Sequence, residues 1–276
     1  MVKLFVKTNE EETIMRLTIK FYLVLAILFA VSTSLYAQAG SDGLILYFSF
    51  DKAIGDQVPD LSAGSHNGVL KGGAKITTTA KYGGGALEIT PQDAAMEVAS
   101  FKELSEYQDN TYLFWIYFLA GSNGAWSQVI AKLVTSPASD RAPGIWINPD
   151  AIGLHYRYNP GNMGFGKIAV GGEGKAFEQK VWYHIAGVKK GAELFFYVNK
   201  KEEGKVAVPA KHDQGAGNLY VGKSPSYRAA TFIIDDLAIY NRALTAAEIT
   251  AASDKGYTAV EAKGKLSTLW GDIKTR

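Results

Sequence analysis

Hydrophobic and polar positions alternate along most of the chain after residue 42. The segment GLILYFSFD (residues 43–51) places its leucines and phenylalanines on one face of an extended chain, because successive side chains in a β-strand point to opposite faces. Similar short runs, bounded by Gly, Pro and Asn, recur as far as residue 241, and two of them (142–161 and 180–204) predict hairpins. Strands of this spacing predict an all-β sandwich or barrel.

One segment, TAAEITAASDKG (245–256), follows a helical pattern instead. Thr245 precedes it as a predicted N-cap, and Glu248 follows three residues later, which is the spacing of a capping box. We expect residues 250–276 to form a C-terminal tail with helical character at its start. Its Lys-rich end predicts a surface appendage, and a partner-binding helix is the alternative.

The first 39 residues have the pattern of a secretory signal peptide. Two basic residues, Arg16 and Lys20, precede an apolar stretch over 21–31, and the sequence Ala37-Gln38-Ala39 resembles a cleavage site. The segment before Met15 is acidic and polar, so we expect Met15 to be the true start. The alternative is that residues 21–41, which carry no charge, remain as a transmembrane anchor.

Composition narrows the expected partners and the compartment. The chain has 276 residues, a net charge of +2 and no cysteine. No long basic run occurs, so nucleic acid is not an expected partner. A domain of this length can bury its own core without disulfides, so the lack of cysteine is compatible with export. Together with the absence of an Asn-x-Ser/Thr sequon, these features favour a secreted bacterial protein, extracellular or periplasmic.

Four segments stand out, in this order along the chain: LYFSFD with GDQVPDLSAGSHNGVL (46–70), AKYGGGALEIT (80–90), VWYHIAGVKKGAELFFYVNKKEEG (181–204) and IDDLAIYNRALTAAEI (234–249). Together they resemble the laminin-G-like members of the concanavalin A-like lectin/glucanase superfamily. The resemblance covers residues 43–249 and implies that a domain of residues 42–249 folds as a jelly-roll sandwich of two antiparallel sheets.

The last strand-like run, TFIIDDLAIYNRAL (231–244), contains two adjacent carboxylates. Strict alternation places Asp235 on one face with Ile233, Leu237 and Ile239, whereas Asp236 points to the other face. Both faces are largely apolar, and a buried carboxylate needs a partner. We expect Asp236 to be a rim carboxylate or a hydrogen-bond acceptor.

The resemblance implies that the partner of Asp235 is a structural calcium ion. Main-chain carbonyls near Phe50 and near Gly84 or Gly85 would complete its coordination, since calcium prefers oxygen ligands. Asp51 and Asp60 are further candidate ligands. The alternative without a metal is that Asp235 accepts hydrogen bonds from backbone N–H groups or pairs with Lys or Arg.

Catalysis is not expected from the residues present. Retaining glycoside hydrolases need two carboxylates about 5 Å apart, and no Glu-x-Asp-x-x-Glu pattern occurs here. The strand carboxylates Glu88, Glu97 and Glu193 stand alone. The sequence also contains no Gly-x-Ser-x-Gly segment and no pair of histidines at metal-binding spacing. A polysaccharide-degrading enzyme is therefore the least supported reading.

The leading prediction is a secreted binding module for carbohydrate, since sugars bind against aromatic faces flanked by polar groups. The resemblance places ligands at the loops and the concave sheet. Candidate contacts are Trp126, Arg141, Tyr156, Tyr158, Asn159, Tyr227 and Arg228, with Asn162 nearby. Core packing is an equal alternative for the two central tyrosines.

Other aromatic and basic positions receive a structural interpretation. We expect Trp115 and Trp146 in the core. We expect His155 and Arg157 to form a solvent-facing pair, and a binding face is the alternative for this pair. The alternative function is a cell-surface module for protein interaction or adhesion, because a fold does not fix a function. The expected partner is thus a glycan or a cell-surface protein, and a membrane only if the anchor is retained.

Overall fold

The computed structural model describes residues 42–135 and 141–255. The chain divides into two units between Asp42 and Gly43, and the fold below belongs to the unit that begins at Gly43. The predicted signal peptide and anchor, with Met15, and the tail beyond residue 255 lie outside the described residues. Of the helices that the structure describes, none has the length and hydrophobicity needed to cross a membrane.

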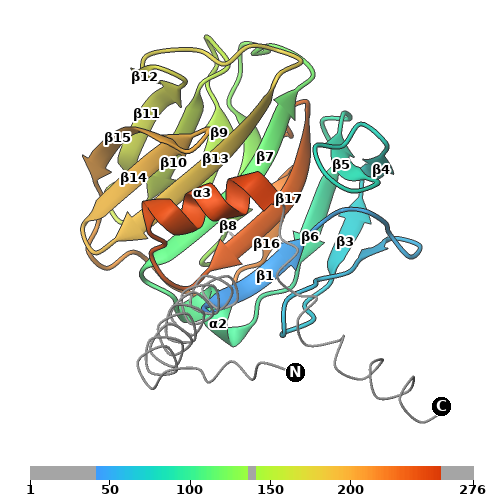
Figure 1. Cartoon of the computed structure of the whole chain (residues 1–276), viewed down its shortest axis with the longest axis horizontal. Helices are drawn as coiled ribbons and strands as arrows, with labels where there is room; N and C mark the ends of the chain where they lie inside the picture. The colour runs from blue at the N-terminus through green and yellow to red at the C-terminus, as the bar shows by residue number, and fades with distance from the viewer. Residues whose placement is uncertain (1–41, 136–140, 256–276) are drawn as a thin grey trace, which may run out of the picture. The chain divides into compact units, whose positions relative to one another are not determined.

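The first sheet has eight antiparallel strands. They are β1 (Leu44–Phe48), β4 (Lys75–Thr77), β5 (Ala86–Ile89), β7 (Asn110–Phe118), β13 (Trp182–Lys190), β14 (Glu193–Val198), β15 (Lys201–Ala207) and β17 (Phe232–Tyr240). Their spatial order is β15-β14-β13-β7-β17-β5-β4, and β1 also pairs with β17 (Figure 1). The predicted hairpin over 180–204 is confirmed as the β13–β14 pair.

The second sheet has nine antiparallel strands. They are β2 (Gln57–Val58), β3 (Gly68–Lys71), β6 (Ala95–Val98), β8 (Ser127–Lys132), β9 (Gly144–Ile147), β10 (Leu154–Tyr158), β11 (Met163–Ala169), β12 (Gly172–Glu173) and β16 (Leu219–Gly222). They follow the order β12-β11-β10-β9-β8-β16-β6-β3-β2. The hairpin expected over 142–161 is confirmed as β9–β10.

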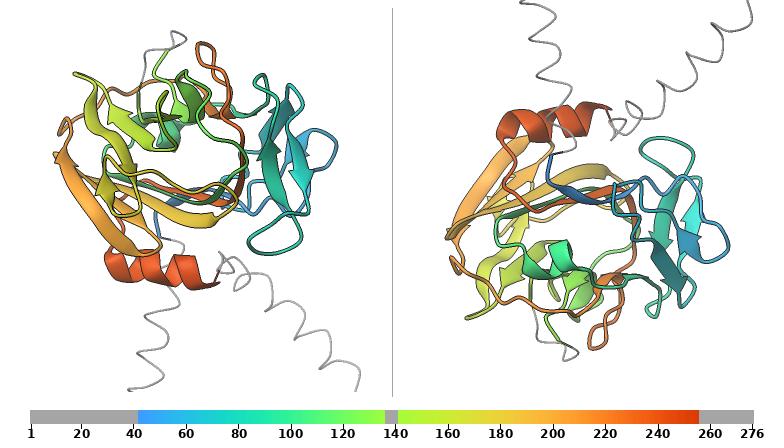
Figure 2. Two further views of the ribbon diagram at one scale, coloured as in Figure 1. Left: turned by 90° about the horizontal axis from the view of Figure 1, so that it is seen from above. Right: turned by 90° about the horizontal axis from the view of Figure 1, so that it is seen from below.

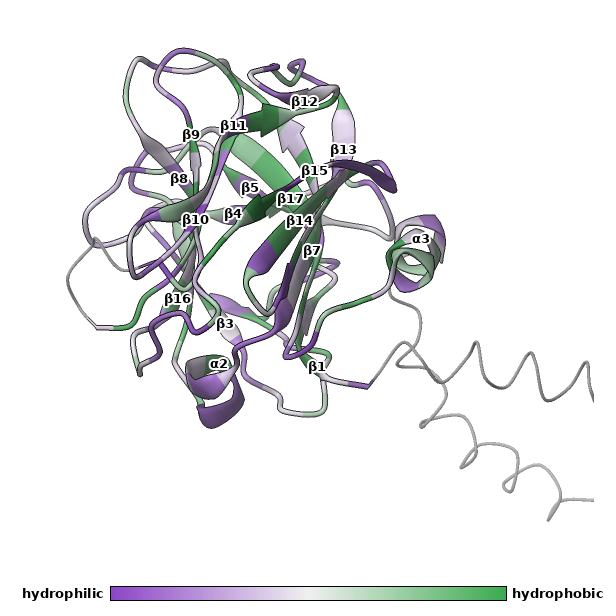
Figure 3. Ribbon diagram, turned by 90° about the vertical axis from the view of Figure 1, so that its left-hand side faces the viewer, coloured by the Kyte–Doolittle hydropathy of each residue, from purple (hydrophilic) through white to green (hydrophobic). Residues whose placement is uncertain are grey.

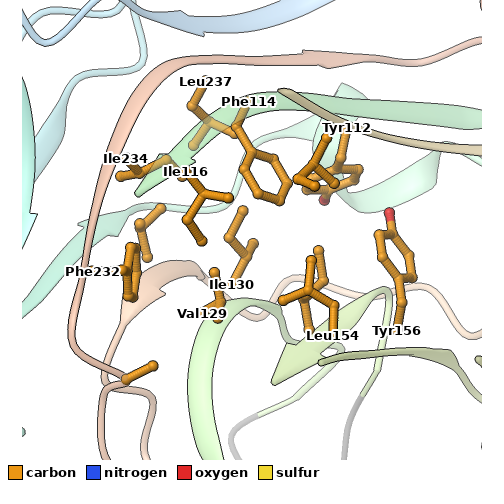
Figure 4. Packing of buried hydrophobic residues seen from close by; sticks show 14 of the residues in the cluster. Tyr112, Phe114, Ile116, Val129, Ile130, Leu154, Tyr156, Phe232, Ile234 and Leu237 are labelled. Atoms are coloured by element: carbon orange, nitrogen blue, oxygen red, sulfur yellow. The ribbon is translucent and has the colours of Figure 1, made fainter. Parts of the chain in front are cut away.

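The two sheets pack face to face around one hydrophobic core. Tyr112, Phe114 and Ile116 of β7 point toward Val129 and Ile130 of the opposite sheet (Figure 4). Burial of this apolar surface is the main favourable contribution to folding, at roughly 25 cal/mol per Å². The predicted all-β class with two antiparallel sheets is confirmed.

Two helices complete the described part of the fold. Helix α3 (Ala246–Lys255) lies outside the eight-stranded sheet, on the side away from the nine-stranded one (Figures 2 and 3). Its capping box forms as predicted: Glu248 N donates to Thr245 Oγ1 at 3.3 Å, and Thr245 N donates to Glu248 Oε2 at 2.8 Å. The short α2 (Lys102–Glu106) was not anticipated from the sequence.

Strand β17 contains a bulge, and the side chains after it point to the opposite face from the one predicted. Asp235 pairs with Trp115 and Ala238 pairs with Leu113, so Asp236 and Leu237 together oppose one residue of β7. Asp236 has a φ of 49°, in the left-handed region. An extra residue reverses the alternation, and Leu237 therefore belongs to the core between the sheets. The expectation that Asp235 shares the face of Leu237 and Ile239 is wrong.

The bulge lies where β17 changes its neighbour. Residues 232–234 of β17 pair with β5, whereas residues 237–240 pair with β1. On the other edge, β7 pairs with β17 along both halves. The two carboxylates therefore occupy the junction between β5 and β1, where regular strand pairing on that edge is interrupted.

Candidate functional site

A cavity of about 190 Å³ opens on the face of the nine-stranded sheet that points away from the core. The residues around it come from β9, β10 and the loops before β8, before β9, after β10 and after β16. They are Trp126, Arg141, Trp146, His155, Asn162 and Tyr227. The volume is below the 300–1,000 Å³ of typical drug-sized ligand sites, so the cavity suits a single small ring.

Strand alternation explains why two of these rings face outward. On β9, Ile145 and Ile147 point into the core, so Trp146 between them points to the opposite face. His155 is the direct cross-strand partner of Trp146 in the β9–β10 pair. Directly opposed side chains on one face of an antiparallel pair are in contact distance, and the register therefore places indole and imidazole together.

The rings form a continuous aromatic surface around the cavity. The ring centroids of Trp126 and His155 are 4.6 Å apart, those of Trp146 and His155 5.7 Å, and those of Trp146 and Tyr227 5.4 Å. Trp126 remains 42% exposed, whereas Trp146 is buried. A Cβ added at Gly144 would collide with the Trp146 ring, so glycine at this position lets the indole lie over the strand.

Polar groups flank these rings. The Arg141 guanidinium carbon lies 5.2 Å from the centre of the Trp146 ring, which is a cation–π distance. Arg157 Nη1 donates a hydrogen bond to the carbonyl oxygen of Asn162 at 2.8 Å and so ties down the loop that carries Asn162. The site thus combines an exposed indole with guanidinium, imidazole and amide groups.

His155 is neutral at physiological pH. Burial lowers the pKa of His155 to about 4, and the charges of Arg157 and Arg141 add to this effect. The hydrogen bond to the Gly166 carbonyl opposes the shift only in part. The imidazole therefore offers one N–H and one lone pair, and it carries no charge.

Three of the seven predicted ligand residues, Trp126, Arg141 and Tyr227, lie together at this cavity, with Asn162 beside them. Two others lie elsewhere. Arg228 is exposed and pairs with Asp93, at 3.0 Å. Asn159 is half-buried, and its backbone N–H donates to the Arg141 carbonyl at 2.9 Å, so it fixes the loop that carries Arg141.

The ligand-binding expectation for Tyr156 and Tyr158 is wrong. Both side chains are 0% exposed and belong to the core between the sheets. The Tyr158 hydroxyl donates to Asn110 Oδ1 at 2.7 Å. Alternation along β10 sends 154, 156 and 158 inward, and the same alternation sends His155 and Arg157 outward.

Trp146 and His155 are the site residues that the sequence interpretation did not assign to the ligand. Trp146 was expected in the core, and His155 was expected in a solvent-facing pair, with a binding face only as the alternative. A usable signal existed, because Trp146 alternates with Ile145 and Ile147 and a nine-stranded sheet has only one face on the core. The alternation does not indicate that the loops carrying Trp126, Arg141 and Tyr227 lie over this particular strand pair.

A second candidate site is the acidic junction on β17. Asp235 is fully buried, and its Oδ2 accepts hydrogen bonds from the backbone N–H groups of Lys81 (2.8 Å) and Tyr82 (3.0 Å). Its Oδ1 accepts one from the backbone of Asp236 at 2.9 Å. Burial nevertheless raises the pKa of Asp235 to about 7, and the charge of Asp236 contributes to the rise.

Asp236 is less well satisfied than its neighbour. The Tyr47 hydroxyl donates to Asp236 Oδ1 at 2.8 Å, whereas Oδ2 is buried without a hydrogen-bond partner among the described residues. Burial raises the pKa of Asp236 to about 6, and the nearby Asp51 carboxylate adds to the rise. Among the described residues, this junction therefore gathers three carboxylates and one unsatisfied buried oxygen.

Asp51, Phe50, Gly84 and Gly85, which were also predicted as calcium ligands, lie close to one another. Asp51 Oδ1 accepts a hydrogen bond from Gly84 N at 2.6 Å, and a Cβ added at Gly85 would lie 2.7 Å from the Phe50 carbonyl oxygen. The Gly-rich stretch and the end of the first strand therefore meet, as the metal hypothesis requires.

Asp60 does not fit the metal hypothesis. Its two oxygens accept four hydrogen bonds, from the backbone of Tyr47, Ser62 and His66 and from the Ser62 hydroxyl. Within residues 42–135 and 141–255, no group of three or more His, Cys, Asp and Glu side chains is arranged to hold a metal ion. A cation at the junction would therefore need main-chain carbonyls among its ligands.

Comparison with solved structures identifies similar folds at low sequence identity. Domain 4 of AbnA, an extracellular arabinanase from Geobacillus stearothermophilus solved with arabinotriose, has a TM-score of 0.56 and 15% identity over 78% of this chain and all of that domain. The binding domain of a paraclostridial mosquitocidal protein has a TM-score of 0.57 and 15% identity over 77% of this chain. A Trypanosoma rangeli sialidase solved with sialic acid has a TM-score of 0.58 and 15% identity over 79% of this chain.

The extent of these matches differs between the relatives. The chain spans about half (52%) of the mosquitocidal chain and a third (33%) of the sialidase chain. No curated protein matches the sequence. A laminin-G family model, described as the concanavalin A-like lectin/glucanases superfamily, matches residues 90–250, which is more than half of the chain. The chain therefore belongs to the concanavalin A-like lectin/glucanases superfamily.

Proposed function

We propose that this protein is an exported, non-catalytic module that binds carbohydrate at the cavity lined by Trp126, Trp146 and His155. The observation that carries the proposal is the exposed Trp126 ring, 42% exposed and in contact with a polar, ring-lined cavity. An exposed indole beside hydrogen-bonding groups fits a sugar, whose ring has apolar C–H faces and a polar edge.

The chemistry of the cavity supports binding without catalysis. None of its six lining residues is a carboxylate, whereas glycoside hydrolysis generally relies on a pair of Asp or Glu residues. His155 remains neutral and its Nδ1 is engaged with a backbone carbonyl, and none of the lining residues is a Ser, Cys or Lys nucleophile.

The similarity to solved structures also supports the proposal of carbohydrate binding. Domain 4 of the arabinanase AbnA shares the fold over its whole length and was solved with a trisaccharide. Export is proposed from the signal-peptide pattern of residues 1–39. On this proposal the module meets glycans outside the cytoplasm, as a secreted or periplasmic protein.

A glycan array with the purified mature chain tests the proposal. We expect binding to a restricted set of glycans, and we expect Trp126→Ala to abolish it without unfolding the protein. Trp182→Ala is the matched control, because Trp182 packs on Tyr117 of the other sheet, outside the cavity. Silence of the wild-type protein across the array would overturn the proposal and favour the alternative of a protein-binding adhesion module.

We further propose that the acidic junction holds a structural calcium ion. The buried Oδ2 of Asp236, the neighbouring Asp235 and Asp51 carboxylates and the close approach of Gly85 to the Phe50 carbonyl support this assignment. Hard carboxylate and carbonyl oxygens are the ligands that calcium prefers. A bound cation would neutralise carboxylates that burial otherwise disfavours as charged groups.

A further inference from the structure

His155 is held in one tautomer by the strand next to it. Its Nδ1 lies 3.0 Å from the carbonyl oxygen of Gly166 on β11. A carbonyl oxygen can only accept a hydrogen bond, so Nδ1 must carry the proton. Because the imidazole is neutral at physiological pH, Nε2 then carries a lone pair and no hydrogen.

Nε2 has no hydrogen-bond partner among the described residues and is not one of the buried unsatisfied atoms. The His155 ring lies between Trp126 and Trp146 and is half-buried at the cavity. The plane of the imidazole is inclined at 58° to the Trp126 ring. The imidazole therefore lies directly beside the exposed indole of the cavity, so a sugar that contacts Trp126 at the cavity also lies next to the imidazole.

Further contacts fix the position of Gly166 and the charge state of His155. The backbone N–H of Gly166 donates to Glu173 Oε1 at 2.7 Å, while the Gly166 carbonyl accepts from His155. The charged groups that face His155 are Arg157 on its own strand, Arg141 in the loop before β9 and Glu173 on β12. The two guanidinium groups disfavour a protonated imidazole, which keeps Nε2 available as an acceptor.

We infer that His155 determines ligand specificity: its Nε2 accepts a hydrogen bond from a free hydroxyl of a sugar stacked on Trp126. The ligand class is a neutral glycan unit with an unsubstituted hydroxyl at that position. The inference rests on the proposed carbohydrate-binding function. Loss of the hydroxyl, or its methylation or sulfation, leaves the lone pair facing a group that cannot donate.

The test compares wild-type protein with three variants in titrations followed by calorimetry and NMR. His155→Phe keeps a ring between the indoles and removes the acceptor. His155→Gln restores an oxygen acceptor. His66→Phe is the matched control, because His66 stacks on Phe101, away from the cavity. The probes are arabinotriose and the methyl glycosides of arabinose, galactose and glucose, each with its full set of monodeoxy derivatives.

Three results are expected for every probe that binds. His155→Phe weakens binding about fivefold or more, the magnitude of one lost hydrogen bond. His155→Gln recovers part of the lost affinity, and His66→Phe binds as tightly as wild type. One monodeoxy derivative is weakened for wild type but not for His155→Phe. Wild-type affinity stays constant between pH 8 and 5.5, since His155 titrates only near pH 4.

Other outcomes overturn the inference. Equal binding by wild type and His155→Phe would remove His155 from recognition while leaving carbohydrate binding intact. Affinity that rises as the pH falls from 7 to 5, or binding restricted to carboxylated or sulfated sugars on the array, would mean that the site selects an anion instead. If no probe and no array glycan binds, the proposed function fails as well.

Discussion

The Tyr47 hydroxyl donates a hydrogen bond to Asp236 Oδ1 at 2.8 Å, linking the first strand to the last across 189 positions of sequence. Both groups are buried. The bond lies at the bulge where β17 passes from β5 to β1, and it adds a side-chain contact to the backbone pairing of β1 with β17. It is also the only hydrogen bond that the described residues donate to the Asp236 carboxylate.

Tyr47→Phe should destabilise the protein by about 1–3 kcal/mol, because it leaves a buried carboxylate without its donor. Urea denaturation at pH 7.5 measures the free energy of unfolding. Tyr197→Phe provides the control, since the Tyr197 hydroxyl also donates to a carboxylate, Glu202, but at the surface. Equal losses in the two variants would show that the buried bond has no special importance.

Calcium should raise the melting temperature if the acidic junction binds it. At a free concentration one hundred times the Kd, binding contributes about 2.7 kcal/mol, which corresponds to roughly 5–10 °C for a domain of this size. EDTA should reverse the shift, and Asp236→Asn should abolish it. Asp150→Asn, at an exposed carboxylate paired with Lys167, should respond like wild type. An identical melting curve with calcium and with EDTA would exclude the site.

Gly144→Ala should damage the proposed carbohydrate site through the Trp146 indole. The added methyl group collides with that ring, and overpacking of this kind costs about 1–3 kcal/mol. We expect a lower melting temperature and weaker binding on the array. Gly121→Ala is a suitable control, because its Cβ would meet only the end of the Gln179 side chain, at 3.3 Å. Unchanged binding by Gly144→Ala would argue against a role for the indole position.

Mild acid should destabilise the fold through His212. This side chain is buried between Tyr107 and Tyr158, and burial together with Lys189 and Lys132 lowers its pKa to about 3. An unfolded histidine titrates near 6.5. Below that pH the unfolded chain binds a proton that the folded chain does not, so this contribution to stability is complete above pH 6.5 and is lost progressively toward pH 3.

His212→Phe removes this titration while keeping a ring between the two tyrosines. Between pH 7 and pH 5, we expect the variant to lose about 2 kcal/mol less stability than wild type in urea titrations. His66→Phe is the matched control, because it replaces a histidine that stacks on Phe101 and not on these tyrosines. The same pH dependence in wild type and His212→Phe would contradict the assignment.

The sequence predicted those features, such as a helix cap and a hairpin turn, that depend only on residues close together in the chain. The Thr245 and Glu248 pair marked the start of α3, and the pattern over 180–204 marked the β13–β14 hairpin, whose turn contains a glycine at position 191 with a φ of 55°. The bulge at Asp236 was not predictable in this way. Its left-handed backbone follows from the meeting of β1, β5 and β7 at one point, which only the assembled sheet imposes.

The candidate site was only half accessible to sequence reasoning, for a related physical reason. Alternation separates Tyr156 and Tyr158 from His155 and Arg157, but it does not say which set faces the core. Trp126, Arg141 and Tyr227 were found because they lie in polar loops. Trp146 was missed because its burial comes from other site residues rather than from the second sheet.

The position of β17 has a consequence for how the chain is made. This strand contributes to the middle of its sheet, with β7 on one edge and β5 and β1 on the other. A nascent polypeptide that ends before residue 232 leaves three earlier segments without their neighbour. Because contacts that are distant in sequence delay folding, this layer can close only after the segment up to residue 240 has left the ribosome.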